Sequence, residues 1–191
     1  MDAPQPSLFD PAEPQGLVYR PGFVSAEEEQ ALAAEIARLP LAPFEFQGFL
    51  GKRRVVSFGW RYVFDGSGLT QAEPIPGFLQ DVRARAAALM GVETEEIVHA
   101  LLTEYAPGAG IGWHRDRSVF GDVVGISLLA PARLRFRRKA GAKWRRAVLE
   151  AEPRSAYLLT GPARTEWEHS IPELDALRYS ITFRTLKGPR P

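Results

Sequence analysis

The sequence contains no cysteine and only three histidines among its 191 residues. The missing thiols exclude disulfides, thiolate nucleophiles and cysteine-based zinc or iron–sulfur sites. No apolar run approaches the ~20 residues that a membrane-spanning helix needs, and the N-terminus lacks the basic start and apolar segment of a secretory signal. Neither a G-x-G-x-x-G nor a P-loop pattern occurs, so a Rossmann-type nucleotide cofactor is not expected. We therefore expect a cytoplasmic protein that does not enter membranes.

Lysine is also scarce, because basic charge comes from 20 arginines and only 4 lysines. The formal net charge is +1, but residues 1–110 carry a net charge of −7 and residues 111–191 carry +8. Arginine forms paired hydrogen bonds with carboxylates and phosphates better than lysine does. The C-terminal half is therefore suited to binding anions, although arginine-rich codon usage would give the same composition.

Length and composition indicate a single domain, because 45% hydrophobic and 25% charged residues are typical of an ordinary globular chain. Residues 1–16 hold four prolines and few large apolar side chains, which predicts a flexible Pro-rich tail. We expect one domain over residues 17–191.

Two helices are predicted in the N-terminal half. Ser25 is followed three residues later by Glu28, which is a capping-box pattern, and Pro40 ends the apolar stripe that comes after it. A second helix is expected over residues 76–90, since it starts with a proline and Gly91 is suited to the C-terminal cap.

Short β-prone runs, separated by glycine and proline, recur from residue 96 onward and indicate a sandwich or barrel. These runs are residues 97–105, 123–129, 133–137, 144–149, 156–160, 165–170 and 177–185. Residues 52–64 also predict a strand or hairpin. Helices first and strands afterwards indicate an α+β fold.

One short motif has the composition of a metal site. His114 and Asp116 are alternate residues of an extended segment, so both side chains face the same way and can reach one ion. His169 follows 55 residues later in another predicted strand. Two histidines and one carboxylate, without a thiolate, are typical of the facial triad that binds non-haem Fe(II). His-x-Asp alone is weak evidence, so this interpretation needs support from the rest of the chain.

The last predicted strand provides such support. Arg178, Ser180, Thr182 and Arg184 share one face, and apolar residues alternate with them on the other. One interpretation is a solvent-exposed outer face. The other is that the two arginines, with Cα atoms roughly 20 Å apart, lean toward each other and hold opposite ends of a short dicarboxylate.

Four segments carry a family resemblance: LTEYAPG at 102–108, IGWHRD at 111–116, HSIP at 169–172 and RYSITFR at 178–184. In this order and spacing the chain resembles the AlkB family of Fe(II)- and 2-oxoglutarate-dependent dioxygenases over about residues 17–187. The resemblance implies an α+β fold with a double-stranded β-helix (jelly roll) core and two N-terminal helices packed outside.

The resemblance also assigns roles to single residues. It implies that His114, Asp116 and His169 bind the iron and form the catalytic centre at which O2 reacts. It implies that Tyr105 and Arg178 hold the distal carboxylate of the co-substrate 2-oxoglutarate.

Three further positions are assigned to the co-substrate by the resemblance. Arg184 would serve the end of 2-oxoglutarate that chelates iron. Ser180 stands where the family often has asparagine, and Thr103 replaces the usual asparagine before the tyrosine.

Substrate-binding residues are expected in three places. Family members that repair nucleobases tend to carry an acid two residues after the metal-binding aspartate, and here that position is Ser118. Arg53, Trp60 and Tyr62 combine charge with aromatic rings in the segment that forms the family's lid over the substrate. Arg135 and Arg137 belong to a predicted hairpin with alternating arginines on one face, which could follow phosphates.

The expected function is oxidative demethylation of N-alkylated bases in DNA or RNA, with release of succinate, CO2 and formaldehyde. The absent acid at Ser118 favours an alternative, in which the enzyme demethylates or hydroxylates a protein side chain. A third hypothesis is a non-enzymatic jelly-roll binding module. We expect a monomer whose partner is alkylated nucleic acid or a protein substrate.

Overall fold

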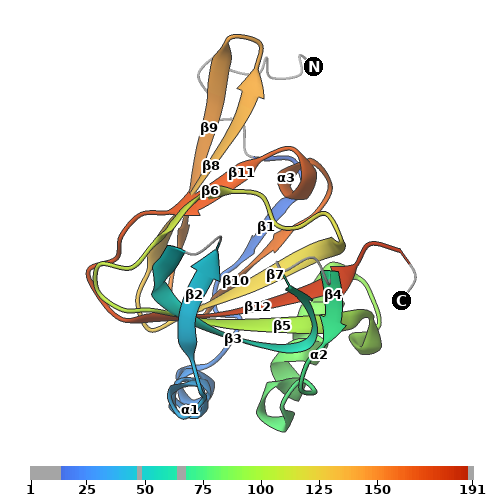
Figure 1. The fold of residues 1–191 in the computed structure, drawn as a ribbon, viewed down its shortest axis with the longest axis vertical. Coiled ribbons are helices and arrows are strands. Elements are labelled where there is room, and N and C mark those ends of the chain that lie inside the picture. The colour runs from blue at the N-terminus through green and yellow to red at the C-terminus, as the bar shows by residue number, and fades with distance from the viewer. Residues whose placement is uncertain (1–13, 47–48, 64–67, 189–191) are drawn as a thin grey trace, which may run out of the picture.

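The structure is a computed structural model that describes residues 14–46, 49–63 and 68–188. Its strands form two antiparallel sheets (Figure 1). The helices are α1 (Ala26–Ala37), η1 (Gly77–Leu79), α2 (Gln80–Met90), η2 (Thr94–Glu96) and α3 (Gly161–Thr165). The strands are β1 (Leu17–Arg20), β2 (Ala42–Phe46), β3 (Phe49–Val63), β4 (Gly68–Gln71), β5 (Ile97–Tyr105), β6 (Ile111–His114), β7 (Phe120–Leu128), β8 (Ala132–Ala140), β9 (Lys143–Ala151), β10 (Ser155–Leu159), β11 (Glu168–Ile171) and β12 (Arg178–Leu186).

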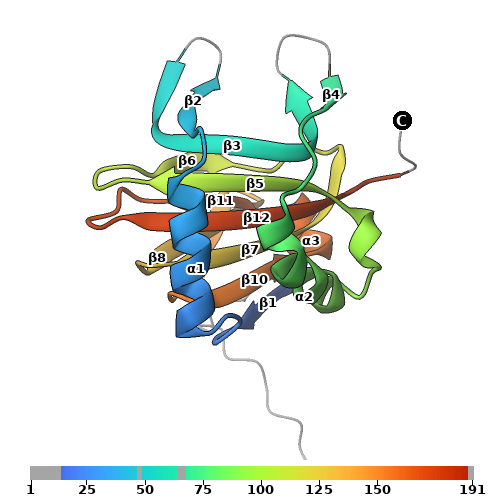
Figure 2. The ribbon, with the colours of Figure 1, turned by 90° about the horizontal axis from the view of Figure 1, so that it is seen from below.

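The larger sheet has the strand order β1-β10-β7-β12-β5-β3-β2, and β4 pairs with β3. Helices α1 and α2 lie across one face of this sheet (Figure 2). Leu32 and Ile36 of α1 pack in one buried apolar cluster with Val82 of α2 and with Ile181 and Phe183 of β12. Burial of this kind contributes about 25 cal/mol for each Å² of apolar surface, so it fixes the helices to the sheet.

The smaller sheet has the strand order β6-β11-β8-β9 and faces the opposite side of the larger sheet (Figure 1). A second apolar cluster lies between the sheets, with Leu134 and Phe136 from β8 against Val123 of β7 and Tyr157 of β10. Two facing antiparallel sheets around such a core are consistent with a double-stranded β-helix, so the expected α+β class and jelly-roll core agree with the structure.

The helix boundaries follow from the capping residues. The Ser25 hydroxyl accepts a hydrogen bond from the Glu28 amide, and the Glu28 carboxylate accepts one from the Ser25 amide, which confirms the predicted capping box. Gly91 caps α2 with a left-handed φ of 72°. The predicted helix over residues 76–90 forms as a short 3-10 turn, η1, that continues into α2.

The strands differ from the prediction in two places. Residues 165–170 are predicted as one strand, but Thr165 ends α3 and β11 begins only at Glu168. Pro162, in the first turn of the helix, favours helical φ there. Strand β1 was not predicted, because its four residues gain stability only by pairing with β10.

The expected tail covers residues 1–16, of which residues 1–13 lie outside the described residues. Residues 15 and 16 accept backbone hydrogen bonds from Ala163 and Thr160, so this end of the segment is fixed to α3. Among the residues that the structure describes, no helix is long and apolar enough to cross a membrane.

Strand β3 changes partner at Gly59. It pairs with β5 up to this residue and with β4 from Trp60 onward. Gly59 has a φ of 76°, and a Cβ there would stand 2.0 Å from the carbonyl oxygen of Val98. Only glycine fits such a close approach in the left-handed region, so this residue directs the second half of β3 away from the sheet.

Candidate active site

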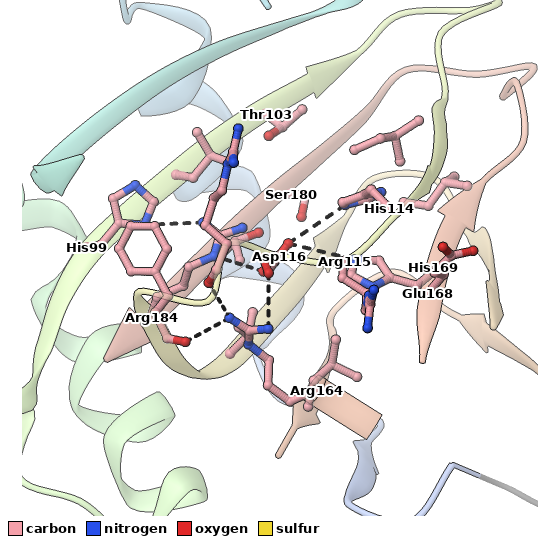
Figure 3. A pocket seen from close by; sticks show the side chains of 18 of the residues that line it. His99, Thr103, His114, Arg115, Asp116, Arg164, Glu168, His169, Ser180 and Arg184 are labelled. Carbon is pink, nitrogen blue, oxygen red and sulfur yellow. Dashed lines mark hydrogen bonds and ion pairs between the residues drawn. The ribbon is translucent and has the colours of Figure 1, made fainter. Parts of the chain in front are cut away.

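The predicted metal ligands come together at the edge of the smaller sheet. His114 ends β6, His169 lies on the neighbouring β11, and the two histidines are directly opposite in the strand register. Asp116 lies two residues beyond His114. One potential ligand atom from each of the three residues lies within 4.8 Å of the other two. Nε2 of His114 is 3.7 Å and Nε2 of His169 is 3.9 Å from Oδ1 of Asp116 (Figure 3). This is a two-histidine, one-carboxylate cluster that can hold a divalent ion on one side.

The orientation of His114 is fixed by its own strand. Nδ1 lies 2.8 Å from the carbonyl oxygen of Gly112. Because a carbonyl only accepts, Nδ1 carries the proton, and Nε2 is left with the lone pair that a metal needs.

Asp116 divides its two oxygens between the histidines and an arginine. Oδ1 faces the histidines, and Oδ2 accepts a hydrogen bond of 3.0 Å from Nε of Arg184. Nη1 of the Arg184 guanidinium also lies 3.2 Å from Nδ1 of His99, which therefore accepts a hydrogen bond from it. His99 stacks on Phe120 with ring centroids 4.8 Å apart, and Cζ of Arg184 lies 5.5 Å from the same phenyl ring.

The electrostatics of the site favour metal binding. Burial lowers the pKa of His169 to about 3, and the neighbouring His114 adds to the effect. Burial also lowers the pKa of His114. Burial opposes ionisation of Asp116, but the charge and hydrogen bond of Arg184 outweigh it and hold the pKa of this carboxyl well below its usual range, and at low pH protonated His169 and His114 would lower it further. At neutral pH the cluster thus has neutral imidazoles and an ionised carboxylate, the protonation states that ligate metals.

Arg164 of α3 holds the loop that follows Asp116. Its guanidinium is buried and donates hydrogen bonds to four backbone carbonyls, those of residues 116, 117, 120 and 121, at 2.7–3.3 Å. These carbonyls belong to the segment that carries the metal ligand Asp116 and the cavity residue Ser118. One side chain therefore sets the path of this segment.

A cavity with a volume of about 1350 Å³ opens over the cluster. Its wall includes the three candidate ligands, together with the following residues of the larger sheet: Thr103, Tyr105, Ser180, Thr182 and Arg184. The side of β12 that bears Arg178, Ser180, Thr182 and Arg184 thus faces inward and is not a solvent-exposed outer face.

The hydrogen bonding of Arg178 shows whether the residues of this strand face can bind a dicarboxylate. The side chain is fully buried, and Nε donates a hydrogen bond of 2.9 Å to Oγ of Ser127. Its Nη1 and Nη2 atoms have no hydrogen-bond partner among the described residues. Unpaired buried donors on a charged group are costly, and a ligand carboxylate would satisfy both at once. With Arg184 at the iron end of the same strand, the residues fit 2-oxoglutarate between them.

The other expected co-substrate residues lie beside these arginines. Tyr105 is opposite Arg178 in the register of β5 and β12, and its ring centroid is 5.2 Å from Cζ of Arg178. Arg178 itself does not line the cavity, whereas Tyr105 does. Thr103 is opposite Ser180, and both line the cavity, so two hydroxyls stand where the family has amides.

The candidate substrate residues divide into two groups. Arg53, Tyr62 and Ser118 line the cavity. Trp60, which pairs with Gln71 of β4, does not line it.

The structure places Arg135 and Arg137, which we expect to follow phosphates, outside the cavity. They project from the outer face of β8, where Arg135 donates to Oγ of Ser170 and Arg137 forms an ion pair with Glu168. Alternation along β8 explains this, since Leu134 and Phe136 occupy the inner face.

Three further residues of the site, His99, Arg164 and Tyr157, have no role in the motifs on which the sequence analysis depends. Tyr157 lines the cavity, and burial raises the pKa of its phenol to about 12, against the lowering effect of Arg178. The contact of His99 with Arg184 follows from the pairing of β5 with β12, in which these two residues are directly opposite. The sequence alone does not give this pairing.

Comparison with known proteins identifies the family. Residues 16–184 match the 2OG-Fe(II) oxygenase superfamily. The chain is 30% identical over 197 residues to the "Alkylated DNA repair protein ALKBH8 homolog" of Arabidopsis thaliana, covering 89% of this chain and 55% of that protein. It is 31% identical over 161 residues to the "Alpha-ketoglutarate-dependent dioxygenase alkB homolog 7, mitochondrial" of Bos taurus, covering 81% of this chain and 66% of that protein.

Solved structures agree on the fold. OsALKBH1 superposes with a TM-score of 0.66 at 15% sequence identity, covering 89% of this chain and 98% of the other. A Pseudomonas putida prolyl-4-hydroxylase superposes with a TM-score of 0.64 at 16% identity, covering 91% and 94%. At these identities the likeness shows the shared fold alone.

The chain belongs to the 2OG-Fe(II) oxygenase superfamily and, within it, to the AlkB homologues. The domain is thus that of an Fe(II)- and 2-oxoglutarate-dependent dioxygenase with a His-Asp-His ligand set. The chain spans about half of the length of the Arabidopsis relative, and 26% of the Xenopus tropicalis "tRNA (carboxymethyluridine(34)-5-O)-methyltransferase alkbh8" that it also resembles.

Proposed function

We propose that this protein oxidatively removes N-alkyl groups from nucleic-acid bases. Fe(II) bound by His114, Asp116 and His169 would supply O2 activation coupled to decarboxylation of 2-oxoglutarate, with one oxygen atom entering succinate and the other the substrate. A hydroxylated N-methyl carbon releases formaldehyde and leaves the unmodified base. The observation that carries the oxygenase assignment is the buried guanidinium of Arg178, whose Nη1 and Nη2 have no hydrogen-bond partner among the described residues.

The chain's own residues would position the reactants. Arg178 and Arg184 would bind the two ends of 2-oxoglutarate, with Tyr105, Ser180 and Thr103 beside it. Arg184 would also keep Oδ2 of Asp116 occupied, so that only Oδ1 is turned toward the metal. These five co-substrate side chains are at most 8% exposed, which limits the access of water to them.

A nucleic-acid substrate is supported by the charge of the cavity wall. Six cationic side chains line the cavity (Arg53, Arg115, Arg117, Arg164, Arg184 and Lys187) against three carboxylates (Asp116, Asp122 and Glu168). Two of these carboxylates are already paired with arginines. An excess of arginine around an opening attracts phosphates.

Aromatic side chains at the same opening would hold a base. Tyr62 lies in the wall with Cζ of Arg117 4.8 Å from its ring centroid, and Phe44 stands 3.9 Å from Cζ of Arg53. An extruded base can stack on such rings. The names of two relatives, an "Alkylated DNA repair protein ALKBH8 homolog" and a "Probable RNA/DNA demethylase ALKBH6", support the same substrate class.

The test is a turnover assay with defined oligonucleotides. The protein is incubated with Fe(II), 2-oxoglutarate and O2, with and without single-stranded DNA that carries 1-methyladenine and 3-methylcytosine. We expect loss of methyl mass from the oligonucleotide with matching formaldehyde and succinate, and no turnover by His114→Ala. Succinate formation without methyl loss would contradict the nucleic-acid proposal and direct the search to protein side chains, which the hydroxyl of Ser118 in place of an acid also favours.

A further inference from the structure

The β8–β9 hairpin projects from the body of the molecule (Figure 1). Its two nine-residue strands pair along their whole length, from Ala132 opposite Ala151 to Ala140 opposite Lys143. At about 3.3 Å per residue each strand is about 30 Å long. Only the base of the hairpin is needed for the core, because Leu134, Phe136 and Ala147 are buried and the residues beyond them are partly or fully exposed.

A row of stacked side chains connects the cavity to this hairpin. Trp113 of β6 lines the cavity wall, and Cζ of Arg135 and Arg137 lie 5.2 and 4.4 Å from its ring. Cζ of Arg137 lies 4.6 Å from the ring of Trp144, which is 37% exposed on β9. Trp113, Arg135, Arg137 and Trp144 thus form a cation–aromatic ladder on the outer face of the smaller sheet.

The hairpin also carries positive charge that the protein does not neutralise. Arg133, Arg137 and Arg138 are paired with glutamates. By contrast, four cationic side chains at its end form no ion pair with any residue in the described part of the chain: Lys139, Lys143, Arg145 and Arg146. Arg146 stands opposite Arg137 and Lys139 stands opposite Trp144, so these two exposed cations lie on the same face as the ladder, whereas Lys143 and Arg145 lie on the other face of the hairpin.

We propose that the ladder, together with Lys139 and Arg146 on the same face, forms a binding track for single-stranded nucleic acid, which leads the strand from the hairpin to the cavity. The inference rests on the proposed function, since the track would deliver the modified base to the metal cluster. Cations without acidic partners bind phosphates, and the flat face of Trp144 accepts a base of any sequence. An acidic peptide would satisfy the charges but has no series of rings to stack on the indole. Duplex DNA keeps its bases inside, away from the indole.

Direct binding tests the track without depending on catalysis. Fluorescence anisotropy measures the affinity of the full chain, loaded with Fe(II) and 2-oxoglutarate without O2, for a labelled unmodified 12-nucleotide single strand at several salt concentrations. We expect the double variant Lys139→Gln with Arg146→Gln to reduce the slope of log K against log salt by about 1.4, because each phosphate contact contributes about 0.7. Trp144→Ala should weaken binding at least about fivefold, the lower bound for loss of one stacked base, without changing that slope.

The matched control removes the same charge elsewhere. Arg20→Gln with Arg38→Gln changes two exposed arginines, on β1 and directly after α1, away from the hairpin, and should leave the affinity and the slope unchanged. An unchanged slope in the Lys139 and Arg146 variant, or equal loss in the control, would overturn the track. Equal affinity for a polyglutamate peptide, with the same dependence on Trp144, would overturn it in favour of a protein partner.

Failure of the track and failure of the proposed function give different results. If the protein demethylates oligonucleotides but the hairpin variants bind them as tightly as wild type, the proposed function is supported and the track is contradicted. Hairpin-dependent binding without demethylation of any methylated oligonucleotide would support the track and contradict the function.

Discussion

Each residue of the candidate site is held by a partner that limits its chemistry. Gly112 sets the tautomer of His114, Arg184 takes up one oxygen of Asp116, and His99 accepts a hydrogen bond from Arg184. Partners of this kind orient ligands before the metal binds, so less reorganisation is needed on binding.

The role of Arg178 leads to a prediction about the co-substrate. Arg178→Gln removes a buried guanidinium whose Nη1 and Nη2 await a ligand carboxylate. A charged hydrogen-bonded contact contributes about 1.5–3 kcal/mol, so the 2-oxoglutarate concentration needed for half-maximal succinate formation should rise at least about tenfold. Arg133→Gln, which alters an exposed ion pair on β8, is the control and should keep the wild-type requirement. An unchanged requirement in Arg178→Gln would show that this arginine does not bind the co-substrate.

Arg164 leads to a prediction about the loop that carries Asp116. Arg164→Lys keeps the charge but cannot place donors on four carbonyls, because an ammonium lacks the planar fork of a guanidinium. Backbone amides of residues 116–121 should exchange hydrogen faster, and the free energy of unfolding should fall by at least about 2 kcal/mol. Exchange mass spectrometry and denaturant unfolding measure both effects, with exposed Arg38→Lys as the control. Wild-type exchange in this loop would mean that Arg164 is not what holds it.

Sequence motifs identified the candidate residues for iron and 2-oxoglutarate better than the residues that support them. His114, Asp116 and His169 stand out because histidine is rare in this chain and the motifs have a fixed spacing. Arg164 and His99 act through contacts with residues 47 and 85 positions away, and no local pattern encodes such contacts.

At the scale of elements, local sequence signals determine where the helices begin and end, whereas several strands form only through pairing with other strands. The capping box placed the start of α1, and Gly91 placed the end of α2. Strands β1 and β6 have four residues each and exist through pairing with β10 and β11, so their own sequences carry little signal. The hairpin β8–β9 was expected, but the outward direction of Arg135 and Arg137 depends on which face meets the larger sheet.

The start of α1 gives a prediction about pH. The pKa of Glu28 is lowered by hydrogen bonds from the Ser25 backbone and Arg85 of α2. A carboxyl whose pKa is depressed by folding stabilises the protein above its ordinary pKa of about 4.5, and this stabilisation is lost as the pH falls through the lower folded value. Glu28→Gln should therefore be less stable than wild type at pH 7, by about 1 kcal/mol, and should lose less stability between about pH 5 and pH 3. The neighbouring Glu27→Gln should keep the wild-type dependence, measured by thermal unfolding, and equal curves for Glu28→Gln and wild type would contradict the role of this contact.

At the scale of the whole molecule, the site is divided between the two sheets. The metal ligands follow or belong to β6 and β11 of the smaller sheet, whereas the two arginines, Tyr105, Ser180 and Thr103 belong to β5 and β12 of the larger one. A metal ion and 2-oxoglutarate bound together would connect both sheets across the cavity.

This division predicts how ligands stabilise the fold. A ligand that binds only the folded state at 100 times its Kd stabilises it by about 2.7 kcal/mol. For a chain of this size, that should raise the Tm by about 5–10 °C. Differential scanning calorimetry with Mn(II) and 2-oxoglutarate should show the full increase in Tm only when both are present. In Arg178→Gln the further increase caused by 2-oxoglutarate should be absent. A Tm that does not change with either ligand would mean that the cavity does not bind them.

The most direct measurement is Fe(II)-dependent release of succinate from 2-oxoglutarate by wild type, Asp116→Ala and Asp122→Ala. Asp116 turns Oδ1 toward both histidines, whereas Asp122 lines the same cavity outside the ligand cluster. Loss of a ligand should cost more than the ten- to hundredfold that loss of a supporting partner costs, so Asp116→Ala should form no detectable succinate and Asp122→Ala should retain activity. Succinate formation by Asp116→Ala at the wild-type rate, or none by wild type, would contradict the assignment of this cavity as the dioxygenase site.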